Sequence, residues 1–129
     1  MQKDFFYSFE NDVMNCIIME NTVISNDLLK QYHTAKVINR EFTKYGFYTK
    51  YEVNPDLKLK SIEKAVLGNV QAKVNNLKNG VGFALYITNG LIDTLEGYTY
   101  DECFPDAILK YKLITWILLT KYNYSWLFI

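Results

Sequence analysis

The chain of 129 residues has the length of one domain, and half of its residues are hydrophobic, so we expect a folded protein with one core over residues 1–129. Its fourteen basic and fourteen acidic residues cancel, and Arg40 is the single arginine, which argues against a nucleic-acid partner. One histidine and two cysteines leave little material for a catalytic or metal site. We therefore expect a protein that is not an enzyme and that needs no cofactor or metal.

The cysteines and the terminal segments favour a cytoplasmic protein. Cys16 and Cys103 form neither a C-x-x-C pair nor a dense disulfide framework, which favours reduced thiols. The first residues place an acid, Asp4, where a signal peptide needs positive charge. The apolar run Leu113–Leu119 is shorter than the about 20 residues of a membrane span, so we expect no membrane segment.

Two helices are predicted at the start of the chain. Phe6, Phe9 and Val13 belong to a set of apolar residues spaced by three and four, which predicts a helix over residues 4–19. The side chains at 25–27 are of the capping type and precede a second, shorter apolar stripe. A second, short helix should follow from there.

Alternation of apolar and polar residues predicts about five strands after the helices. Asn89-Gly90 is the strongest turn signal, because a type I′ turn needs positive φ at both central residues. Strands joined by short turns form an antiparallel β-meander, so the predicted fold class is α+β, with the two N-terminal helices packed on the sheet. The predicted strands are residues 36–42, 47–53, 70–74, 83–88 and 91–98, with a charged loop over residues 55–66.

The C-terminal segment, residues 108–129, is rich in large apolar side chains, among them Leu113, Trp116 and Trp126. At about 25 cal/mol per Å² of buried apolar area, packing this segment would contribute several kcal/mol. We expect an apolar C-terminal helix or strand that docks on the protein's own core or on a second copy. The second case would make the chain a homo-oligomer through its tail.

His33 has no carboxylate or cysteine at ligand spacing, so a structural role on the short helix is the favoured interpretation. Gly80-Val81-Gly82 opens a strand and lacks a third glycine, which excludes a nucleotide-binding fingerprint. An alternative function stays open, namely a small-molecule-binding protein or enzyme with an aromatic pocket between helices and sheet. That pocket would be lined by Tyr45, Tyr48, Tyr86 and His33.

Charge is unevenly distributed along the chain. Residues 30–78 hold ten basic and four acidic residues, whereas residues 93–106 hold five acidic residues and no basic one. The acidic stretch is interpreted either as a solvated strand and loop or as a metal site, an acid–base pair or an anionic docking surface. Alternation puts Asp93 and Glu96 on opposite faces, which argues against a ready pair. Because tyrosine is frequent in interface hot spots, we expect a partner-binding surface made of Asp93, Glu96, Tyr98, Tyr100, Asp101 and Glu102.

Two blocks of the sequence resemble a group of small, uncharacterised bacterial proteins. Residues 40–47 read R-E-F-T-K-Y-G-F, and residues 95–102 read L-E-G-Y-T-Y-D-E after an alternating strand and an N-G turn. The group includes proteins like the immunity partners of contact-dependent inhibition toxins. The resemblance covers residues 27–106 and departs at Cys103-Phe104-Pro105, where such proteins carry P-W-P.

The resemblance implies a toxin-neutralising immunity-type protein, which binds a cognate toxin domain and blocks its active site or its access to substrate. Such a function needs a complementary surface and no catalytic group, in agreement with the composition. Many toxins of this kind are basic nucleases, which an acidic strand could engage by imitating their substrate. The expected partner is therefore a toxin domain.

Overall fold

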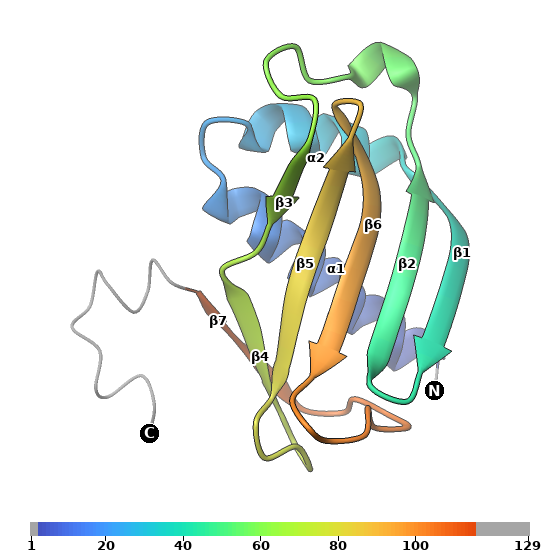
Figure 1. The fold of residues 1–129 in the computed structure, drawn as a ribbon, viewed down its shortest axis with the longest axis vertical. Helices are drawn as coiled ribbons and strands as arrows, with labels where there is room; N and C mark the ends of the chain where they lie inside the picture. Colours follow the sequence, from blue (N-terminus) through green and yellow to red (C-terminus); the bar gives the residue numbers. More distant parts are fainter. Residues whose placement is uncertain (1–2, 116–129) are drawn as a thin grey trace, which may run out of the picture.

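The computed structural model describes residues 3–115, which form two helices followed by one antiparallel sheet, so the α+β class is confirmed. Both helices lie against the same face of the sheet and leave the other face open (Figure 1). The elements are α1 (Lys3–Glu20), α2 (Ser25–Thr34), β1 (Lys36–Thr43), β2 (Gly46–Glu52), a 3-10 turn η1 (Pro55–Leu57), β3 (Ala65–Leu67), β4 (Val70–Val74), β5 (Val81–Thr88), β6 (Leu91–Thr99) and β7 (Tyr111–Thr115).

The sheet holds seven strands within the described range, in the order β1-β2-β6-β5-β4-β7, with β3 also paired to β5. Every pair is antiparallel. The consecutive strands β4, β5 and β6 form a meander. β2, however, lies beside β6, so after β2 the chain passes the positions of β6 and β5 before it enters the sheet again at β3 and β4 (Figure 1). The predicted five-stranded meander is therefore wrong in the number of strands and in the neighbour of β2.

The core lies between the sheet and α1. Within the predicted stripe of α1, Phe6, Phe9, Val13 and Ile17 expose at most 2% of their surface, while Cys16 is half-buried. The Phe6 ring packs edge-on against Phe47 of β2, with 4.8 Å between ring centroids, and Phe9 lies 5.8 Å from Phe83 of β5. These contacts join the helix to strands on both sides of β6.

The Asn89-Gly90 turn is held against α2 by one buried glutamine. Gln31 Nε2 donates to the carbonyl oxygens of Gly90 and Leu57, both at 2.9 Å, and its Oε1 accepts from the Ile92 N–H at 2.8 Å. Asn89 and Gly90 have φ values of 53° and 74°. The positive φ at both positions confirms the predicted turn.

Two local predictions are corrected, and a third is resolved for the part of the C-terminal segment that the structure describes. Ser25 is the first residue of α2, and Ile24 at the N-cap makes no side-chain hydrogen bond, so residues 25–27 do not cap the helix as predicted. β3 lies at the end of the predicted loop and is too short for its period to be recognised. The C-terminal segment begins as strand β7, which pairs with β4, and its remaining residues, 116–129, lie outside the described residues.

Candidate functional site

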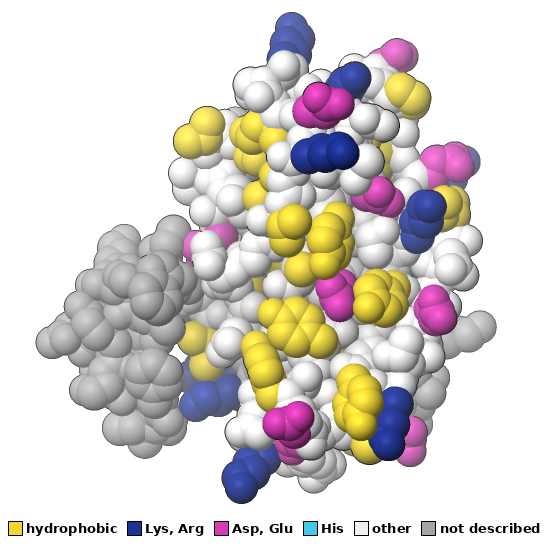
Figure 2. All heavy atoms as spheres, in the orientation of Figure 1, with side chains coloured by type: hydrophobic (Ala, Val, Ile, Leu, Met, Phe, Trp, Pro, Cys, Tyr) yellow, Lys and Arg dark blue, Asp and Glu magenta, His cyan; other side chains and the backbone are white. Residues whose placement is uncertain are grey.

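The open face of the sheet carries four tyrosines, which we call the tyrosine face: Tyr48 on β2, Tyr86 on β5, Tyr98 on β6 and Tyr100 directly after β6. Each remains 36–41% exposed. Figure 2 shows hydrophobic side chains gathered across the middle of this face. Aromatic rings that stay accessible on a sheet without covering helices form a surface suited to docking.

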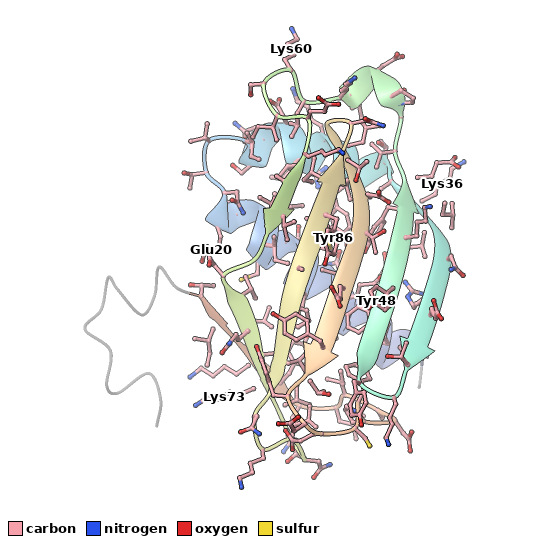
Figure 3. The ribbon with its side chains drawn as sticks, in the orientation of Figure 1. Glu20, Lys36, Tyr48, Lys60, Lys73 and Tyr86 are labelled. Carbon is pink, nitrogen blue, oxygen red and sulfur yellow. The ribbon has the colours of Figure 1, made fainter. Side chains whose placement is uncertain are left out.

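Glu96 of β6 lies among these tyrosines. Tyr48 Oη donates to Glu96 Oε2 at 3.2 Å, and Tyr86 Oη donates to Glu96 Oε1 at 2.8 Å. The two tyrosines reach it from β2 and β5, which flank β6 (Figure 3). The charge of Glu96 raises the pKa of Tyr48, and the hydrogen bond to Glu96 raises the pKa of Tyr86, so both hydroxyls remain donors.

Gly82 of β5 makes room for the other two tyrosines. The Tyr98 and Tyr100 rings pack edge to face, with 5.6 Å between their centroids. A Cβ atom at Gly82 would come within 2.5 Å of Tyr100 Oη and 2.6 Å of the Tyr98 ring. The glycine therefore lets both rings lie close against the sheet. Tyr100 Oη also accepts a hydrogen bond from Gln71 Nε2 at 3.4 Å.

This arrangement suits a cationic side chain supplied by a partner. A carboxylate offers an ion pair, and the faces of neighbouring tyrosine rings attract the same cation. Each oxygen of Glu96 accepts one tyrosine hydroxyl, and a carboxylate oxygen can accept a further hydrogen bond. The tyrosine face can therefore bind a lysine or arginine without losing its internal hydrogen bonds.

The predicted contact residues lie in different surroundings. Glu96, Tyr98 and Tyr100 belong to the tyrosine face. Asp93 is the unpaired residue at a shift in the β5–β6 register, and its Oδ1 accepts from the Thr94 hydroxyl at 3.1 Å. This bulge interrupts the strict alternation from which Asp93 and Glu96 were placed on opposite faces.

Asp101 and Glu102 follow the end of β6. The Glu102 carboxylate accepts from the backbone N–H groups of Lys78 at 2.7 Å and Asn79 at 2.8 Å, which lowers its pKa. It thus ties the end of β6 to the turn between β4 and β5. Asp101 is exposed and has a positive φ of 58°. Among the predicted acids, Glu96 is the one that the tyrosine hydroxyls surround.

The covered face holds a second carboxylate that the sequence reasoning missed. Glu10 of α1 is 1% exposed, and Arg40 of β1 binds it through Nη2 to Oε1 at 2.7 Å and Nε to Oε2 at 3.0 Å. The Thr49 hydroxyl donates to Oε2 at 2.5 Å. Burial lowers the pKa of Arg40, but the hydrogen bond and charge of Glu10 outweigh it and raise the pKa overall.

A pocket of about 470 Å³ opens beside this ion pair, between α1, the end of α2, and β1 and β2. The alternative prediction placed an aromatic pocket between helices and sheet, but only His33 of its four lining residues is here. Tyr48 and Tyr86 lie on the open face, and Tyr45 lies in the β1–β2 turn. The lining residues are Tyr7, Glu10, Asn11, Tyr32, His33, Ala35, Val37 and Tyr51.

Other kinds of site find less support between residues 3 and 115. No three His, Cys, Asp or Glu side chains in that range come together as a metal site requires. Cys16 is half-buried and Cys103 exposed, and both are free thiols. Neither described helix combines the length and the apolar character of a membrane span.

Comparison with family models, curated proteins and solved structures finds no significant match to this chain.

Proposed function

We propose that this chain is a toxin-neutralising, immunity-type protein that binds a cognate toxin domain through the tyrosine face and blocks its activity. The observation that carries the proposal is Glu96, set among exposed tyrosine rings on a sheet face without helices. Tyrosine is enriched among residues that dominate interface affinity. One of the two blocks whose sequence resembles immunity-type proteins, residues 95–102, contains Glu96, Tyr98 and Tyr100 of this face.

The toxin surface that fits this face is basic. A lysine or arginine of the toxin that reaches Glu96 would also contact the rings of Tyr48 and Tyr86. A nuclease presents such residues where it binds the phosphates of its substrate. An immunity protein seated on them would exclude the nucleic acid, so that binding alone is enough for inhibition.

The chemistry of the tyrosine face favours binding over catalysis. The pKa values of Tyr48 and Tyr86 are raised by Glu96, and that of Tyr98 is raised by burial and by Tyr100. A phenol whose pKa lies above its usual value forms even less phenolate at neutral pH, so it is poorly suited to act as a general base. These hydroxyls are better suited to donate hydrogen bonds to a partner.

The test is co-expression with a toxin domain, sought first in the genes next to the one that encodes this chain, read out as growth, and calorimetric titration of the purified pair. The wild-type protein should restore growth and bind the toxin in a one-to-one complex. Glu96→Lys should weaken binding by at least about thirtyfold, because loss of a desolvated charge pair costs about 2 kcal/mol or more.

The matched control is Glu63→Lys, which makes the same charge change at an exposed position in the loop before β3. It should leave both growth and affinity unchanged. Failure of the wild-type chain to bind the toxin overturns the proposal. Equal affinity of Glu96→Lys and the wild type overturns the assignment of the tyrosine face as the toxin-binding surface.

A further inference from the structure

A second carboxylate lies on the open face of the sheet, in one row with Glu96. In the strand register, Tyr48 of β2 is opposite Glu96 of β6 on one side and opposite Glu41 of β1 on the other. Residues directly opposite each other in an antiparallel sheet project from the same face. Glu41 is therefore exposed on the open face, and the row Glu96, Tyr48, Glu41 crosses three neighbouring strands (Figure 1).

Both carboxylates act on the tyrosine between them. The charge of Glu96, and to a smaller extent that of Glu41, raises the pKa of the Tyr48 hydroxyl. The Tyr48 side chain is 41% exposed, so its ring is accessible between the two charges. Among residues 3–115, no basic side chain forms an ion pair with Glu41. The row thus offers a partner two negative charges on either side of an aromatic ring.

Lys50 limits this acidic row in the direction of β2. It is exposed on the same face as Tyr48, two residues further along the strand, and its register partners are Asn39 and Thr94 instead of the two glutamates. Two residues along a strand span about 7 Å. Basic side chains of a partner are therefore attracted to the row itself and repelled from the position of Lys50.

The spacing of the two carboxylates favours a helix as the element that reaches both. Neighbouring strands lie about 4.8 Å apart, so the backbones at Glu41 and Glu96, two strands apart, are separated by about 10 Å. On an α-helix, residues i and i+7 point in nearly the same direction and lie about 10.5 Å apart along the axis. Same-face residues of a strand lie about 7 Å apart at i+2 and about 13 Å apart at i+4, and neither distance matches.

We propose that the partner docks an α-helix across β6, β2 and β1, with basic side chains at positions i and i+7 on Glu96 and Glu41 and an apolar side chain between them on the Tyr48 ring. Helix positions i+3 and i+4 lie about 4.5 and 6 Å from position i, close to the distance of one strand from Glu96 to Tyr48. The helix belongs to the toxin domain, so the inference rests on the proposed function and adds the element that the toxin presents.

The experiment is a fluorescence anisotropy titration of the full chain into two labelled peptides, each kept helical by a side-chain cross-link. The first peptide carries arginine at i and i+7 and leucine at i+3. The second has the same composition but places the second arginine at i+5, on another side of the helix. The first should bind at least about fivefold more tightly, the upper range for an exposed ion pair. Equal affinity of the two peptides overturns the proposal.

Two variants of the chain test the assignment of Glu41. Glu41→Gln should weaken binding of the first peptide about fivefold and leave that of the second unchanged. The matched control is Glu52→Gln, which removes the same charge from the same face, four residues after Tyr48 and outside the row. It should leave the affinity for the first peptide unchanged. Equal effects of the two variants on the first peptide would refute the role of Glu41.

The peptide titrations and the toxin experiments can fail separately. A toxin that binds the wild type and Glu41→Gln with equal affinity contradicts this inference and leaves the proposed function standing. Selective binding of the first peptide by a chain that neutralises no toxin supports the helix-docking row and contradicts the proposed function. Because Glu41 is exposed, Glu41→Gln should keep the circular dichroism spectrum of the wild type, so its lower affinity reports on the surface and not on folding.

Discussion

Two glutamates among tyrosines occupy the two faces of one sheet and are stabilised in different ways. Glu10, on the covered face, is 1% exposed and is bound by Arg40 and Thr49. Glu96, on the open face, is half-buried and accepts hydrogen bonds from Tyr48 and Tyr86. Among the described residues, the buried carboxylate is paired with a cation, whereas the accessible one accepts from neutral donors.

The difference follows from desolvation. A buried charge without a counter-charge is costly, so the single arginine of the chain is used at Glu10. A carboxylate in contact with water needs no such partner, and Glu96 keeps its charge available for another molecule. The covered face therefore serves stability, and the open face is free to serve binding.

The largest expected loss of stability follows a substitution of Arg40, on the covered face. Arg40→Met keeps a long apolar side chain but removes the guanidinium, and the Glu10 side chain is only 2% exposed. The free energy of unfolding should fall by about 3 kcal/mol, because the carboxylate stays buried without its counter-charge. Urea denaturation measures the change, and Glu10→Gln combined with Arg40→Met should recover part of it. A loss below about 1 kcal/mol would show that the pair acts as an exposed salt bridge.

The second effect is a loss of stability at alkaline pH. The pKa of Tyr51 is raised in the folded state by burial, so the folded protein retains a proton that the unfolded chain loses above about pH 10. The contribution is fully present below that pH and is lost as the pH rises, by about 1.4 kcal/mol per pH unit. Urea denaturation between about pH 9 and pH 11 measures this slope.

Tyr51→Phe removes one proton from this linkage and should reduce the slope by about 1.4 kcal/mol per pH unit. Tyr86→Phe should change the slope little. The pKa of Tyr86 is also raised, but its hydroxyl bonds to Glu96 on the exposed face, where solvent screens the interaction. The burial of Tyr32 raises its pKa as well and should leave a residual slope in Tyr51→Phe. Equal slopes in the two variants would mean that Tyr51 is hydrated in solution.

The strands that could be predicted from the sequence are those with one buried and one exposed face. In β2, Phe47, Thr49 and Tyr51 are buried while Tyr48 and Lys50 are exposed, and the alternation is visible in the residues. β3 has only three residues, which is too short for a period. The pairing of β2 with β6 involves no local turn, so no short-range signal could have indicated it.

The same limit applies to the tyrosine face. Glu96, Tyr98 and Tyr100 were predicted as contact residues from one stretch of sequence. Tyr48 and Tyr86 reach Glu96 only through the register of β6 with β2 and β5. Residues distant in sequence cannot be assigned to one surface until the strand order is known.

The Glu10–Arg40 ion pair, in contrast, left a signal in the sequence. Glu10 lies four residues after Phe6 and three before Val13, within the apolar stripe of the predicted helix. A charged residue at such a position needs a partner when the helix packs, and Arg40 is the only arginine in the chain. This combination predicts a buried ion pair, although not the strand position that brings the two residues together.

The smallest expected effect is on the open face, at Glu96→Gln. The amide oxygen can still accept one tyrosine hydroxyl, and water can bond to the other. The free energy of unfolding should therefore change by less than about 0.5 kcal/mol, as for most exposed substitutions. Urea denaturation of Glu96→Gln and of Arg40→Met under the same conditions compares the contribution of the two faces to the free energy of unfolding. A loss as large as that of Arg40→Met would mean that Glu96 is desolvated in solution, as it would be beneath a second copy of the chain, and the tyrosine face would then serve self-association instead of toxin binding.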